Sequence, residues 1–267
     1  MNKVISADGT PIAYDRSGQG PAVILVDGAL CSRAQGPMPD LAARLAPEFT
    51  VYHYDRRGRG DSGDTAPYAV EREVEDLAAM IEEAGGTACV YGSSSGAALA
   101  LAAAAAGLPI SRVAAFEAPF VVDDSRDRFP RTWIADLSEL AASDRRGEAV
   151  TYFMTKGIGL PGFVVTMMKL MPAWKQLKAV AHTLPYDATV LGDNCFGEPL
   201  DASQWKAVST PVLVVGGGKS PQWMRTSVKA LADAVPGATH REIPGQNHMI
   251  KATAIAPVLR EFFGGVR

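Results

Sequence analysis

The feature that most constrains the fold is a regular alternation of strand-like and helix-like segments. Short apolar segments at residues 22–26, 49–55, 87–92 and 112–119 are typical of strands, and the unbroken run at 22–26 is typical of a strand buried on both faces. Residues 70–84 between them place apolar side chains at helical spacing. This alternation predicts an α/β fold with a doubly wound, mostly parallel sheet.

The alternation stops in the middle of the chain and resumes near its end. Between residues 123 and 209 the strand signals fade, and prolines separate short helical runs. We therefore expect a core made of residues 1–122 and 210–267. Residues 123–209 would form a helical cap inserted between core strands, over one end of the sheet.

Composition narrows the classes of partner. A net charge of −3 gives no reason to expect nucleic acid, and no apolar stretch reaches the length of a membrane span. The first nine residues lack the apolar segment of a secretory signal, and three scattered cysteines favour a reduced, cytoplasmic protein. The basic segment 56–60, flanked by Asp55 and Asp61, is expected to be a polar turn. We expect a small-molecule substrate and a monomer or homodimer.

Three consecutive serines raise the question of a nucleophile. The segment YGSSSGAALA, residues 91–100, contains G-x-S-x-G in one register only, centred on Ser94. A strand pattern precedes it and a helix pattern begins near Ser95, which is the context of a nucleophile elbow. A plain Gly/Ser turn is the alternative. The elbow would place the Ser94 hydroxyl at the carboxyl edge of the sheet, beside a helix N-terminus.

A serine nucleophile needs a base. Of the four histidines, His53 and His240 lie in strand patterns and His182 lies in the expected cap. His248 follows the last strand, precedes the last helix and comes last in the order Ser–acid–His. We expect His248 to be the base, with helix capping as the alternative role.

The sequence resembles the α/β-hydrolase superfamily over essentially its whole length. The resemblance rests on the turn at residues 55–63, on the elbow at Ser94, on the cap placement and on G-x-x-H before the last helix. It implies a serine, histidine and acid triad and a backbone oxyanion hole. It implies nothing specific about the substrate.

The triad acid departs from the common pattern of the superfamily. The family usually carries it after the strand that follows the cap, where residues 211–223 here contain no Asp or Glu and Lys219 stands instead. Glu117 ends the strand after the elbow helix, and haloalkane dehalogenases resemble this placement. Lactonases that open zearalenone have similar short motifs at residues 27–28, 92–97 and 117–119. We expect Glu117 to be the acid, with Asp123 and Asp124 as alternatives.

The oxyanion turn is a second departure. The usual His-Gly is Asp27-Gly28 here, but the donors are backbone N–H groups, so the side chain need not matter. We assign the hole to Ser95 together with Gly28 or Ala29, and leave the choice between the last two open. The Asp27 side chain is expected to point away and pair locally, because it would repel an oxyanion.

The expected cap is rich in methionine and aromatic residues, most of which should form its own core. We expect some to face the substrate, namely Met154, Met168, Trp174 and Trp133.

The expected triad and cap together favour a serine hydrolase acting on an apolar ester or lactone, with no cofactor and no metal. A non-catalytic or single-turnover ligand-binding protein, a carbon–carbon bond hydrolase and a perhydrolase are the alternatives.

Overall fold

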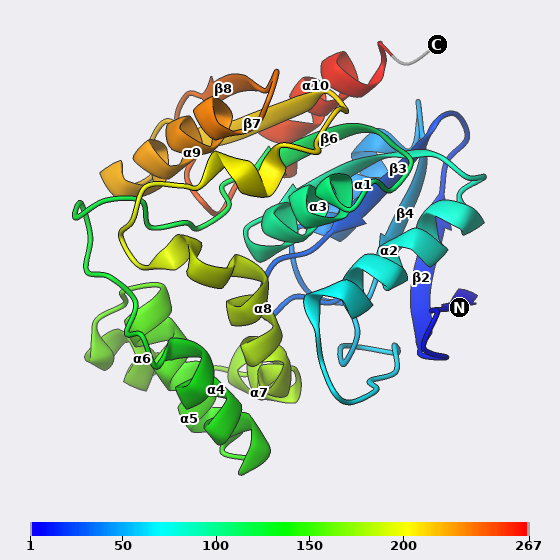
Figure 1. The fold of residues 1–267 in the computed structure, drawn as a ribbon. Helices are drawn as coiled ribbons and strands as arrows, with labels where there is room; N and C mark the ends of the chain where they lie inside the picture. The colour runs from blue at the N-terminus through cyan, green and yellow to red at the C-terminus, as the bar shows by residue number, and fades with distance from the viewer. Residues whose placement is uncertain (1, 266–267) are drawn as a thin grey trace.

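The computed structural model describes residues 2–265 and contains one eight-stranded sheet (Figure 1). The strand order is β1-β2-β4-β3-β5-β6-β7-β8. The strands are β1 (Asn2–Ile5), β2 (Pro11–Ser17), β3 (Ala22–Val26), β4 (Thr50–Tyr54), β5 (Ala88–Ser93), β6 (Ile110–Phe116), β7 (Val212–Gly217) and β8 (Thr239–Ile243). β2 pairs in antiparallel fashion with both β1 and β4, and the other neighbours pair in parallel. The predicted mostly parallel sheet is confirmed.

Helices cover both faces of the sheet, as the prediction of a doubly wound fold requires. Buried residues of α1 (Met38–Leu45) and α10 (Ala252–Phe263) share one apolar cluster. Buried residues of α2 (Val70–Glu83), α3 (Ser95–Ala105) and α9 (Gln222–Ala234) belong to the other.

Strand β3 shows why the sheet is stable between these layers. Val23 and Leu25 belong to one cluster, whereas Ile24 and Val26 belong to the other. Successive side chains of a strand point to opposite faces, so an unbroken apolar run suits a strand covered on both sides.

Helical segments alone connect β6 to β7 within the described chain. They are α4 (Trp133–Ala142), α5 (Arg146–Tyr152), the π-helical η1 (Phe153–Gly157), α6 (Gly162–Met168), α7 (Ala173–Ala179), η2 (Ala181–Thr183), α8 (Leu184–Leu191), η3 (Gly192–Cys195) and η4 (Ala202–Trp205). In Figure 1 the green helices lie together beyond one end of the sheet, and α8 runs back toward α3, which it contacts. We call residues 123–209 the helical insertion; its role as a cap stays a prediction.

The basic segment 56–60 forms a turn, as predicted, but its arginines are buried in the protein. Arg56, Arg57 and Arg59 are each only 1% exposed. Each guanidinium binds a carboxylate from α2 or from the helical insertion. The pairing partners lie far along the chain, which is why the sequence pattern concealed them. Among residues 2–265, none of the helices is long and apolar enough to cross a bilayer.

Candidate active site

Ser94 stands at the junction of β5 and α3. Its φ angle is +57°, in a region that residues other than glycine rarely adopt, and its N–H donates to the carbonyl of Phe116 at 2.9 Å. α3 begins at the next residue, Ser95. The predicted succession of strand, turn and helix around Ser94 is therefore present, and Ser94 is partly exposed at the carboxyl edge of the sheet.

The glycines of G-x-S-x-G are needed for space. A Cβ on Gly92 would lie 2.6 Å from the carbonyl carbon of Gly96, and a Cβ on Gly96 would lie 2.6 Å from the carbonyl oxygen of Asp27. Contacts that close force the backbone to shift. The two glycines thus allow helix α3 and the turn after β3 to approach each other closely around Ser94.

His248 lies in the loop between β8 and α10, and its partner is Glu117. The His248 Nδ1 atom is 2.8 Å from Oε2 of Glu117. The Glu117 side chain is completely buried, whereas that of His248 is 37% exposed. Glu117 directly follows β6 with a φ of +45°. The structure thus brings Glu117 to His248, and leaves Nε2 of that ring available for another partner.

The second oxygen of Glu117 is held as well. Oε1 accepts hydrogen bonds from the Gly217 N–H at 2.7 Å and from the Ser220 hydroxyl at 2.6 Å. Both donors come from the end of β7 and the turn after it. That turn therefore supplies two donors to an acid on the neighbouring strand, in the stretch where the superfamily usually carries the acid itself. Sequence reasoning missed Ser220, since only the absence of a carboxylate there drew notice.

The alternative acids lie elsewhere. Asp123 bonds to Ser125, and Asp124 pairs with Arg128 at the surface. The structure does not bring either of them to His248.

The oxyanion turn packs directly against the nucleophile. A Cβ on Gly28 would lie 2.9 Å from Cβ of Ser94 and 3.6 Å from its Oγ. Ser95, at the start of α3, and Ala29, beside Gly28, place the other expected N–H groups in the same neighbourhood.

The Asp27 side chain points away from the nucleophile, as expected. Its Oδ2 lies 2.7 Å from Nε2 of His53, and both side chains are buried. Burial raises the pKa of the Asp27 carboxyl, against the opposing effect of His53. The sequence predicted a structural role for His53, and its contact in the structure is with Asp27.

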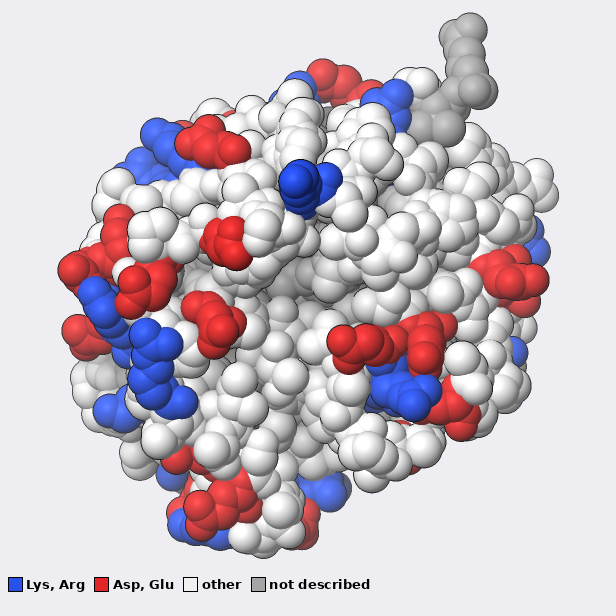
Figure 2. Space-filling model, viewed as in Figure 1, with Lys and Arg blue, Asp and Glu red and all other residues white. Residues whose placement is uncertain are grey.

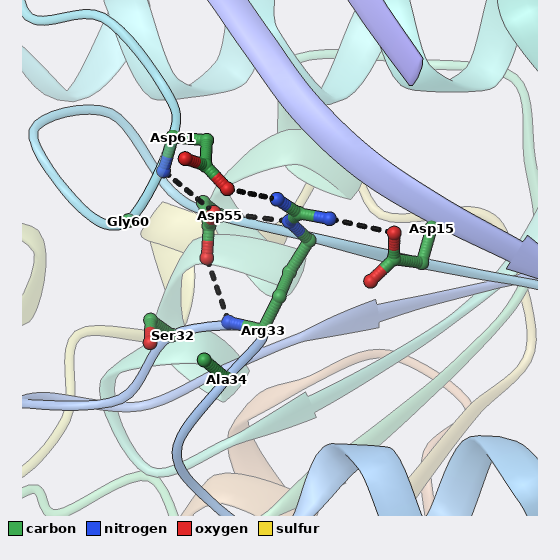
Figure 3. A pocket seen from close by; sticks show the side chains of 7 residues that line it. All are labelled: Asp15, Ser32, Arg33, Ala34, Asp55, Gly60 and Asp61. Atoms are coloured by element: carbon green, nitrogen blue, oxygen red, sulfur yellow. Dashed lines mark hydrogen bonds and ion pairs between the residues drawn. The ribbon is translucent and has the colours of Figure 1, made fainter. Parts of the chain in front are cut away.

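Beyond the oxyanion turn, Arg33 fastens the chain to the core (Figure 3). Its guanidinium binds Asp15, Asp55 and Asp61, and its N–H donates to Asp55 at 2.6 Å. A small cavity of about 150 Å³ lies beside these side chains. The three carboxylates raise the pKa of Arg33, although burial opposes them. The three ion pairs of Arg33 therefore hold the far end of the loop that begins at Gly28.

All four residues expected to contact substrate belong to the helical insertion, and three of them are buried within it. Trp133 is 1% exposed and stacks on Phe129, while Met154 and Trp174 are 7% and 8% exposed. Met168 is partly buried against the same cluster. In this conformation the first three mainly build the core of the insertion, and their contact with substrate stays a prediction.

The face drawn in Figure 2 is hollowed near its centre. The hollow is bordered mainly by uncharged side chains, and acidic and basic groups lie around it. Within residues 2–265, no group of three His, Cys, Asp or Glu side chains could hold a metal ion.

Comparison with known proteins assigns the family. The profile of the alpha/beta hydrolase family matches residues 27–250, which span both the elbow and His248. The chain belongs to this family. An α/β hydrolase from Sphaerobacter thermophilus DSM 20745 is 55% identical, with 98% of this chain and 100% of that chain covered and a TM-score of 0.90. Family membership makes this protein a hydrolase in the general sense.

More distant solved structures share the fold of this hydrolase. An enol-lactonase from Burkholderia xenovorans LB400 is 20% identical, covers 98% of this chain and 100% of its own, and has a TM-score of 0.70. An esterase from Thermogutta terrifontis is 21% identical, with 99% of this chain and 98% of that chain covered and a TM-score of 0.70. A search of curated proteins gives no match.

Proposed function

We propose that this hydrolase cleaves an ester or lactone bond of a small, largely apolar substrate through an acyl-enzyme. Ser94 is the nucleophile, His248 the base and Glu117 the acid that orients it. The observation that carries the proposal is the 2.8 Å contact between the buried Glu117 and His248, at the sheet edge where Ser94 occupies a strained elbow. Strain of this kind concentrates at functional sites.

The chemistry follows from these positions. His248 Nε2 accepts the proton of the Ser94 hydroxyl as Oγ attacks the substrate carbonyl carbon, and the resulting imidazolium is stabilised by Glu117. The carbonyl oxygen becomes an oxyanion, which the N–H of Ser95 and that of Gly28 or Ala29 bind. The tetrahedral intermediate collapses, His248 protonates the departing alcohol oxygen, and an acyl-Ser94 ester remains.

Water completes the cycle. His248 takes a proton from a water molecule, whose oxygen attacks the acyl carbon. The bond between the acyl carbon and Oγ then breaks, His248 returns the proton to Oγ, and the acid and free Ser94 are released. A lactone would yield one hydroxy acid, because its alcohol and acyl parts are joined. Within residues 2–265, Ser94 Oγ forms no hydrogen bond with His248, and in a free enzyme this bond often closes only when substrate binds.

The apolar character proposed for the substrate rests on the helical insertion, which is rich in methionine and aromatic groups. Methionine side chains adapt to apolar ligands of varied shape. The esterase and enol-lactonase that share the fold are consistent with acyl chemistry on this scaffold.

Pre-steady-state kinetics tests the proposal. With a 4-nitrophenyl ester, we expect a burst of nitrophenolate equal to the enzyme concentration, followed by slower turnover. Ser94→Ala should show neither phase while keeping the wild-type circular dichroism spectrum. Turnover by folded Ser94→Ala at the wild-type rate would refute the mechanism. A panel of esters and lactones of increasing size would then rank the substrate class by kcat/KM.

A further inference from the structure

A buried cluster of four charged side chains lies directly behind the oxyanion turn. We call Arg56, Arg59, Glu73 and Asp187 the ion cluster; each of them is at most 2% exposed. Arg56 donates two hydrogen bonds of 2.6 Å to Glu73 and one of 2.7 Å to Asp187. Arg59 donates to both oxygens of Asp187, at 2.8 and 2.7 Å. Two positive and two negative charges compensate each other, as burial requires.

The ion cluster touches each part of the expected oxyanion hole. Arg59 Nη1 donates to the carbonyl oxygen of Gly28 at 2.6 Å, and Arg56 Nη1 donates to that of Asp27 at 3.2 Å. The hydroxyl of Ser95 donates to Oδ1 of Asp187 at 2.7 Å. Asp187 therefore reaches the oxyanion turn through both arginines and reaches the elbow helix directly.

These contacts fix the direction of the N–H groups. In a planar trans peptide, the N–H of one residue points opposite to the carbonyl of the residue before it. Holding the Gly28 carbonyl toward Arg59 turns the Ala29 N–H away from the ion cluster, and holding the Asp27 carbonyl toward Arg56 does the same for the Gly28 N–H. Ser95 is held through its own side chain.

We propose that Asp187 is a positioning residue of the oxyanion hole. It contacts no reacting atom and acts through Arg56, Arg59 and Ser95. Because Asp187 lies on α8, the helical insertion contributes a residue that supports the oxyanion turn of the core. The inference rests on the proposed function, since it assumes that the N–H groups near Ser94 bind an oxyanion.

The variant Asp187→Asn tests this role. It keeps the size of the side chain but removes the charge that holds both guanidinium groups. Oxyanion donors act in the transition state, so kcat should fall while KM changes little. Removing a donor outright costs on the order of 10²–10³ in rate, and we expect misaligned donors to cost about 10- to 100-fold. The affinity for an alkyl boronic acid, whose tetrahedral adduct on Ser94 places an oxygen in the hole, should fall by a similar factor.

Asp76→Asn is the matched control. Asp76 is equally buried and binds Arg57 of the same segment through two hydrogen bonds of 2.7 and 2.8 Å. Among the described residues, neither Asp76 nor Arg57 forms a hydrogen bond to the oxyanion turn. A purely structural role for buried carboxylates predicts equal effects in the two variants. The positioning role predicts wild-type kcat per folded active site in Asp76→Asn.

The experiment measures kcat, KM and boronate affinity for wild type, Asp187→Asn, Asp76→Asn and Ser95→Ala, with active sites counted by the nitrophenolate burst. Ser95→Ala removes the hydroxyl that donates to Asp187 and accepts from Arg56, and it should lower kcat and boronate affinity in the same way. This variant decides the question if Asp187→Asn does not fold. Wild-type kcat and affinity in folded Asp187→Asn, or in Ser95→Ala alone, would overturn the proposal, as would an equal loss in Asp76→Asn. A wild-type enzyme without a burst would instead refute the proposed function, and this inference with it.

Discussion

Glu117 Oε2 and His248 Nδ1 lie 2.8 Å apart although 131 residues separate them in the sequence. Parallel pairing makes this possible, because β6, β7 and β8 are neighbours whose carboxyl ends share one edge. β7, between the other two strands, contributes the Gly217 N–H to the same carboxylate. The acid and the base therefore span three strands, and the middle strand holds the acid in place.

The first prediction concerns the acid itself. Glu117→Gln should lower kcat by about 10²- to 10⁴-fold, because the amide neither stabilises the imidazolium nor fixes the required tautomer of His248. Steady-state kinetics on a 4-nitrophenyl ester measures this. Asp123→Asn and Asp124→Asn, which change a partly exposed and an exposed carboxylate, are the controls and should retain wild-type kcat. A comparable loss in either control would contradict the assignment of Glu117.

The second prediction concerns the residue that supports the acid. Ser220→Ala removes a buried donor to Glu117 and leaves Oε1 with the Gly217 N–H. A hydrogen bond to a charged group contributes about 1.5–3 kcal/mol, so the free energy of unfolding should fall by roughly that amount, and kcat should fall as Glu117 becomes less fixed. Urea unfolding and kinetics measure both. Ser203→Ala, at an exposed hydroxyl bonded to Asp201, should change neither.

The third prediction concerns the elbow. In Gly96→Ala the new methyl group would press into the carbonyl oxygens of Val26 and Asp27, which displaces the helix relative to the oxyanion turn. We expect a loss of stability of about 1–3 kcal/mol together with a large loss of kcat. Gly162→Ala, at the start of α6 where a Cβ meets no atom within 4 Å, is the control. An active, stable Gly96→Ala enzyme would show that this close approach is not needed.

The fourth prediction concerns acid stability. Burial raises the pKa of Glu73, but the charge and hydrogen bonds of Arg56 outweigh burial and hold it below the ordinary value of 4.5. Its contribution is therefore fully present above the pKa of the unfolded chain and is lost as pH falls through the lower folded pKa. Where the unfolded chain binds one proton more than the folded protein, the unfolding free energy changes by about 1.4 kcal/mol per pH unit.

Glu73→Gln tests that contribution. The difference in unfolding free energy between wild type and Glu73→Gln should be constant near neutral pH and shrink below about pH 4.5. Urea titrations from pH 7 to pH 3 measure the difference. Glu71→Gln, at an exposed position of α2, controls for the loss of one carboxylate. A difference that stays constant down to pH 3 would argue against the depressed pKa.

Local patterns predicted the sheet, the elbow and the position of His248, because each depends on residues close in sequence. The apolar run of β3 and the glycines around Ser94 are examples. Glu117 was also predictable, since its place after β6 sets the edge at which it emerges. The ion cluster was not predictable: Arg56 and Arg59 read as a polar turn, and only the tertiary contact with Asp187, 128 residues beyond Arg59, explains their burial. Ser220 was hidden for the same reason.

The most direct test of the central claim is intact-mass analysis after reaction with a fluorophosphonate, followed by peptide mapping. We expect one phosphonate per chain, located on Ser94, with the labelling rate strongly reduced in Glu117→Gln. Folded wild-type protein that takes up no label, or takes it up at another residue, would contradict the assignment of Ser94 as an activated nucleophile.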